Sequence, residues 1–83
     1  MAGESAVLGR VIKEYRERLG LSQEDLAAYS GLNRTYVGEV ERGETNPSFE
    51  TLLKISATLQ VQLSTLVADY EQISLERPDS GSA

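Results

Sequence analysis

Residues 22–43, SQEDLAAYSGLNRTYVGEVERG, decide the fold of this chain. Ser22 and Asn33 are residue types that cap helix N-termini, and each precedes apolar residues at helical spacing. The stretch therefore predicts two short helices, over about residues 23–29 and 34–42, joined by a turn of three or four residues.

A turn this short places demands on the side chains around it. The helices need a small residue where they cross, the turn needs a residue that accepts a positive φ, and the inner faces must be apolar. The residues that meet these demands are Ala27, Gly31, Leu26, Leu32, Val37 and Val40.

Apolar stripes flank this pair of helices on both sides. Residues 5–19 carry apolar side chains at spacings of three and four, which predicts a first helix that ends before Gly20. Ser48 can cap a fourth helix, which carries the most apolar stripe, and a fifth stripe over residues 63–73 has Ser64 as its expected cap. The prediction is an all-α, compact five-helix domain.

Length and composition limit the possible functions. At 83 residues the chain has room for one domain, which we expect over residues 1–76, followed by a disordered tail over residues 77–83. The sequence has no cysteine and no histidine, which removes disulfides, thiolate metal sites and the usual general base, so we do not expect an enzyme. No apolar stretch approaches the roughly 18 residues of a membrane span. We therefore expect a cytoplasmic protein without membrane contact, cofactor or small-molecule ligand.

The charge balance argues against a nucleic-acid partner. The chain has 13 acidic and 8 basic residues, for a net charge of −5, whereas nucleic-acid binders usually carry a basic footprint. Total charge does not describe its distribution, however, and a small domain can collect its cations on one face while its acids occupy another.

The joint pattern of residues 22–43 resembles the Xre/Cro family of helix-turn-helix transcriptional regulators, and the resemblance covers about residues 8–67. The run NRTYVGEVERGE, residues 33–44, is especially similar to the controller proteins of restriction–modification systems. The residues that carry the family pattern are Gln23, Ala27, Gly31, Leu32, Val37, Val40 and Glu41. The resemblance implies a lambda-repressor-like domain in which the helix over residues 34–42 is the recognition helix and lies in the major groove of DNA.

In such a domain the N-terminal residues of the recognition helix reach the base edges. Arg34 can donate two hydrogen bonds to O6 and N7 of guanine, and Thr35 offers a hydroxyl and a methyl group. Tyr36 is a third candidate for a base contact. Glu39, one turn further along, either accepts a hydrogen bond from N4 of cytosine or repels phosphate, and the sequence leaves both readings open.

Other polar residues are candidates for positioning roles. We expect Asn33 to contact a phosphate. The resemblance implies three further phosphate contacts, by Gln23, Asn46 and Ser48. The resemblance also implies a structural ion pair between Arg16 and Glu41.

The fifth stripe has more apolar surface than a four-helix core needs, so we expect it to form a homodimer interface. The alternative is that the stripe completes the core of the monomer. The candidate interface residues are Leu66, Val67, Tyr70 and Ile73. The leading hypothesis is a homodimeric regulator that binds a pseudo-palindromic operator of double-stranded DNA and blocks or recruits RNA polymerase. The alternative is a protein-interaction module of the same fold, antitoxin-like or an adaptor, that uses its acidic surface and its fifth helix. Salt distinguishes the two hypotheses, because phosphate binding weakens steeply as the salt concentration rises.

Overall fold

A computed structural model describes residues 3–76, and the tail predicted for residues 77–83 lies outside this range. The described residues form five helices and no strand: α1 (Glu4–Arg18), α2 (Gln23–Ser30), α3 (Arg34–Glu41), α4 (Phe49–Thr58) and α5 (Leu63–Glu76). The predicted all-α architecture is confirmed, and the bounds expected for the first three helices, 5–19, 23–29 and 34–42, differ from the observed bounds by at most one residue at each end.

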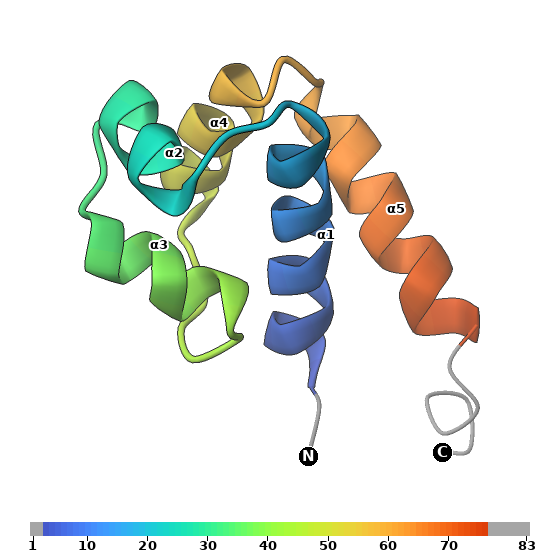
Figure 1. Cartoon of the computed structure of the whole chain (residues 1–83). Helices are drawn as coiled ribbons and strands as arrows, with labels where there is room; N and C mark the ends of the chain where they lie inside the picture. The colour runs from blue at the N-terminus through green and yellow to red at the C-terminus, as the bar shows by residue number, and fades with distance from the viewer. Residues whose placement is uncertain (1–2, 77–83) are drawn as a thin grey trace.

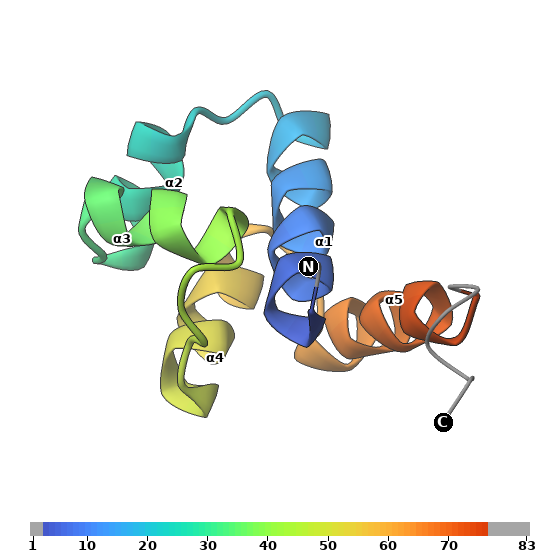
Figure 2. The same ribbon diagram turned by 90° about the horizontal axis from the view of Figure 1, so that it is seen from below.

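The helix α1 lies at the centre of the domain. Figures 1 and 2 show α2, α3 and α4 on one side of α1 and α5 on the other. The helix α1 contacts both α3 and α5, while α4 packs against α2 and α5. The core is formed by the buried side chains of Val11, Ile12, Leu26, Ala27, Val37, Val40, Ile55, Leu59 and Leu66.

The caps around the central turn form as their residue types predict. The Ser22 hydroxyl accepts a hydrogen bond from the amide of Asp25, and the Asp25 carboxylate accepts one from the amide of Ser22, both at 3.0 Å. The Asn33 side chain accepts bonds from the first amides of α3. Gly31 ends α2 with a φ of 71°, a conformation that favours glycine.

The start of α5 differs from the prediction. Because the helix begins at Leu63, Ser64 lies inside the first turn and is not its cap. The carbonyl of Gln62 accepts the first backbone hydrogen bonds of this turn, from Thr65 and Leu66. The Ser64 hydroxyl instead donates to the Gln62 side chain at 3.4 Å.

Leu66 has a different role from the one expected. Its side chain is 0% exposed and packs in the core, so Leu66 completes the core of the protomer and presents no exposed surface to a second one. The periodicity that marks a helix face does not distinguish a residue that seals the monomer core from one that a partner would cover.

A glycine in α1 determines how closely α3 can approach. A Cβ atom on Gly9 would lie 2.3 Å from the carbonyl oxygen of Val40 and 2.5 Å from that of Glu41. Any side chain at this position would collide with the backbone of α3. Gly9 therefore fixes the position of the C-terminal half of α3 against α1.

None of the helices within residues 3–76 is both long enough and apolar enough to cross a membrane.

Candidate nucleic-acid interface

The first turn of α3 presents polar side chains to solvent. Asn33, Arg34 and Thr35 are exposed, and the Arg34 guanidinium makes no ion pair with any carboxylate in residues 3–76. Tyr36 is half-buried because its ring packs against the core, and Glu39 is half-buried one turn further along. The base-contact candidates thus differ in accessibility, with Arg34 and Thr35 the most accessible.

A buried ion pair holds α3 against α1. The Arg16 Nε and Nη2 atoms donate to the two carboxylate oxygens of Glu41 at 2.6 and 2.9 Å, and these side chains are only 9% and 2% exposed. Arg16 Nη1 donates to the carbonyl of Leu21 at 2.7 Å, so all three guanidinium nitrogens are used. The hydrogen bond to Glu41 raises the pKa of Arg16, which keeps the guanidinium charged. This is the pair that the family resemblance implies.

Gln23 joins this network from the start of α2. Its Nε2 atom donates to Glu41 Oε1 at 2.9 Å. A primary amide carries two N–H groups, so this bond fixes the side chain and leaves one N–H to donate elsewhere. The helices α1, α2 and α3 are therefore tied together by one carboxylate at the C-terminal end of α3.

The connector after α3 holds a second ion pair, this one exposed. The Nε and Nη2 atoms of Arg42 donate to the two carboxylate oxygens of Glu44 at 2.9 and 3.2 Å. This hydrogen bonding raises the pKa of Arg42 and lowers that of Glu44. This pair was not predicted from the sequence, although an Arg and a Glu on either side of a helix-ending glycine are a local signal for it.

Asn46 and Ser48 hold the segment that leads into α4. The Asn46 side chain accepts a hydrogen bond from the hydroxyl of Ser5 in α1. The Ser48 hydroxyl accepts a hydrogen bond from the amide of Thr51 at 3.1 Å, and so caps α4. Both residues thus have structural partners, and both are exposed.

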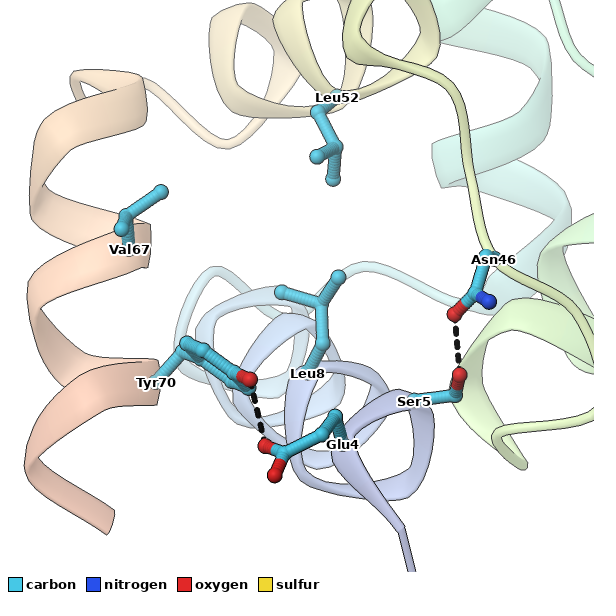
Figure 3. Close-up of a pocket in the computed structure, with 7 residues that line it drawn as sticks. All are labelled: Glu4, Ser5, Leu8, Asn46, Leu52, Val67 and Tyr70. Carbon is cyan, nitrogen blue, oxygen red and sulfur yellow. Dashed lines mark hydrogen bonds between the residues drawn. The ribbon is translucent and has the colours of Figure 1, made fainter. Parts of the chain in front are cut away.

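An apolar pocket lies between α1, α4 and α5. It has a volume of about 250 Å³, and Figure 3 shows side chains from all three helices and Asn46 around it. Its lining residues are Glu4, Ser5, Leu8, Asn46, Leu52, Val67 and Tyr70. At one edge the Tyr70 hydroxyl donates to the Glu4 carboxylate, and at another Ser5 bonds Asn46.

The remaining candidates for a dimer interface lie on α5. The side chain of Val67 is 39% exposed beside the pocket, whereas those of Tyr70 and Ile73 are half-buried against the core. Val67 is therefore the most accessible of the three, and Leu66 is not accessible at all.

The sequence of this chain is similar to that of known proteins with a helix-turn-helix. A helix-turn-helix family model matches residues 12–66. The transcriptional regulator SlrR of Bacillus subtilis (strain 168) is 43% identical over 76 residues, which cover 90% of this chain but 49% of SlrR, so the chain spans about half the length of that relative.

Two solved structures are similar in both fold and sequence. The restriction–modification controller protein C.AhdI from Aeromonas hydrophila is 44% identical with a TM-score of 0.74, over 75% of this chain and 94% of that one. The biofilm regulator SinR, solved in complex with DNA, is 41% identical with a TM-score of 0.69, over 72% of this chain and 97% of that one.

Proposed function

The chain belongs to the Xre/Cro-type helix-turn-helix family of DNA-binding transcriptional regulators, and we propose that it binds a pseudo-palindromic operator as a homodimer. The family is not enzymatic. In this proposal α3 is the recognition helix and lies in the major groove. Bound at a promoter, the dimer regulates transcription by blocking or recruiting RNA polymerase.

The observation that carries the proposal is the accessible first turn of α3. Arg34 is exposed and has no carboxylate partner within residues 3–76, so its planar guanidinium is available for a bidentate contact with guanine. Thr35 stands beside it with a hydroxyl and a methyl group. We propose that Tyr36 and Glu39, both half-buried, contact bases at the edge of this site.

Neutral donors supply the proposed phosphate contacts. Asn33 uses its side-chain oxygen to cap α3, which leaves the Nδ2 amino group as a donor, and Gln23 keeps one N–H. Asn46 and Ser48 lie at the start of α4, where the helix dipole favours an anion. Because neutral donors hold phosphate without a basic surface, the net charge of −5 is compatible with DNA binding.

The second protomer is proposed to pack against α5. Val67 and the pocket beside it form apolar surface that a copy of the chain would cover, with Tyr70 and Ile73 at the margins. Two-fold symmetry then presents two α3 helices to successive major grooves, about one helical turn of DNA apart.

The test compares Arg34→Ala with Arg10→Ala, because each variant removes one exposed arginine. Arg10 lies on α1, and within residues 3–76 its ion pair is with Glu14, at 3.4 Å. The ligand is a duplex selected by the parent chain from a random DNA pool, and a scrambled duplex is the reference. Arg34→Ala should weaken the selected duplex by roughly 1–3 kcal/mol per half-site and the scrambled duplex much less.

Arg10→Ala should change the two affinities little and by similar factors. Equal losses on both duplexes for Arg34→Ala would make Arg34 a phosphate contact and not a base reader. If the parent chain selects no DNA sequence at all, the proposal of an operator is wrong.

A further inference from the structure

We propose that Glu44 competes with a DNA phosphate for Arg42, so that the Arg42–Glu44 ion pair opens when the domain binds DNA and Glu44 limits its affinity. The inference rests on the proposed function and adds to it a phosphate-binding arginine and the acid that holds that arginine in the free protein.

The ion pair has the geometry of a phosphate contact with a carboxylate in the place of the phosphate. Two guanidinium nitrogens of Arg42, Nε and Nη2, each donate to a different oxygen of Glu44, at 2.9 and 3.2 Å. Arginine binds phosphate through the same pair of parallel N–H groups. Glu44 therefore occupies the Nε–Nη2 edge of the guanidinium, one of the edges through which a phosphate could bind.

Arg42 lies on the side of α3 that also carries Arg34. Residues 34, 38 and 42 are spaced by four and follow one side of the helix, with Gly38 between the two arginines. A Cβ atom on Gly38 would lie 2.9 Å from Arg42 Nη1 and 3.6 Å from Gln23 Oε1. The guanidinium of Arg42 and the side chain of Gln23, one of the proposed phosphate contacts, therefore both lie close to Gly38.

The backbone holds Glu44 where it can act as a competitor. Its amide donates to the carbonyl of Glu39 at 2.9 Å, and the amide of Gly43 donates to Val40 at 3.0 Å, so the chain reverses in a fixed turn after α3. The side chains of Arg42 and Glu44 remain 55% exposed. Exposed pairs contribute little to stability, so an exchange of Glu44 for phosphate costs the fold little.

The pair also lowers the positive charge that the surface beside α3 presents to DNA. While Glu44 is paired, Arg42 contributes no net positive charge to the surface. On release, the carboxylate stays close to the incoming phosphate and repels it. Both effects lower the affinity for any DNA sequence, because neither involves a base edge.

The experiment is a double-mutant cycle on Glu44 and Arg42, read by DNA affinity. Glu44→Gln should tighten binding of the selected and the scrambled duplex alike, by about three- to tenfold per half-site. Arg42→Gln should weaken both duplexes and reduce the slope of log affinity against log salt by about one per arginine. In the Arg42→Gln background, Glu44→Gln should have much less effect, because the competition no longer exists.

The matched control is Glu50→Gln, which removes an exposed carboxylate from the first turn of α4. No ion pair of Glu50 is found within residues 3–76, so this variant reports the general effect of one less negative charge. A thermal melt of each variant checks that the fold is intact.

Three results would overturn the inference. In the first, Glu44→Gln leaves the affinity unchanged or weakens it, which would mean that the pair orients Arg42 for DNA. In the second, Glu44→Gln tightens binding equally with and without Arg42, which would mean that Glu44 acts only by repelling the charge of DNA and not by competing for Arg42. In the third, the parent chain binds neither duplex, which would overturn the proposed function as well, whereas the first two results leave that function intact.

Discussion

At the scale of single residues, the two buried charged side chains of residues 3–76 are Arg16 and Glu41, and they are buried against each other. Removing one member of such a pair leaves the other charge uncompensated in a region of low polarity. Arg16→Ala should therefore lower the free energy of unfolding by roughly 3–5 kcal/mol. Arg10→Ala, which breaks an exposed pair, should lower it by less than about 1 kcal/mol.

Urea unfolding followed by circular dichroism measures both variants. A midpoint for Arg16→Ala equal to that of the parent would show that the pair contributes nothing to stability. A large loss for Arg10→Ala as well would point to a general effect of charge on α1 and not to burial.

The residues that sequence analysis identified correctly are those whose roles depend on near neighbours. Ser22, Asn33 and Gly31 act within one or two turns of their own position, so the local sequence contains the information. Gly9 and Leu66 are different, because their roles depend on which helix packs against them. The Arg16–Glu41 pair spans 25 residues and was expected only through the family resemblance.

At the scale of helices, α4 ends in an unfavourable conformation. Gln60 has a φ of 63° and is the one residue other than glycine with a positive φ in the described range. Its amide donates to Ala57 and that of Val61 to Ser56, both at 3.1 Å, a pattern that glycine usually completes. Three other helices in the described range are followed by a residue with a positive φ, and that residue is a glycine each time: Gly20, Gly31 and Gly43.

Gln60→Gly should therefore stabilise the domain. The left-handed conformation costs a residue with a Cβ atom roughly 1–2 kcal/mol, and the greater freedom of glycine in the unfolded chain offsets part of the gain. We expect a net increase of about 0.5–1 kcal/mol in the free energy of unfolding. Gln62→Gly, at a position without a positive φ, should be neutral or destabilising in the same urea titration. A lower midpoint for Gln60→Gly than for the parent would refute this account.

The helix α5 is held to α1 by two phenol–carboxylate hydrogen bonds. Tyr15 of α1 donates to Asp69 of α5, and Tyr70 of α5 donates to Glu4 of α1. These hydrogen bonds, with partial burial, raise the pKa of both phenols. A proton that is bound more tightly in the folded state adds stability below the unfolded pKa, and this stability is lost as the pH rises through the folded pKa.

The free energy of unfolding should therefore fall as the pH rises above about 10, the ordinary pKa of tyrosine. In the double variant Tyr15→Phe, Tyr70→Phe it should be lower than in the parent near neutral pH and fall less steeply between about pH 10 and 11.5. Tyr29→Phe, at a tyrosine that is 70% exposed, is the control and should keep the slope of the parent. Equal slopes for the parent and the double variant would mean that ionisation of the two phenols does not cause the loss of stability at high pH.

Across the whole domain, the most acidic helix lies apart from the two arginines proposed to contact DNA. The helix α5 carries Asp69, Glu71 and Glu76 and no basic residue, whereas Arg34 and Arg42 lie on α3 and in the connector after it. Because α1 stands between α3 and α5, the acidic helix is held away from the proposed DNA-binding face (Figures 1 and 2). The total charge does not describe this arrangement, so a net charge of −5 does not argue against the proposed function.

The proposed dimer can be tested without loss of the fold, because one of its interface residues is exposed in the protomer. Val67 is the most exposed of the proposed interface residues, so Val67→Asp should leave the monomer folded, whereas a charge at the buried Leu66 would disrupt the core. In a two-fold dimer the new carboxylate is buried twice, and we expect dissociation to become at least about a hundredfold easier. Gln72→Asp adds the same charge at an exposed position of α5 outside the apolar stripe and is the control. Sedimentation equilibrium should then find the parent and Gln72→Asp as dimers and Val67→Asp as a folded monomer. If Val67→Asp sediments as the same dimer as the parent, the protomers meet at another surface, and the spacing of the two α3 helices must be derived from that surface instead.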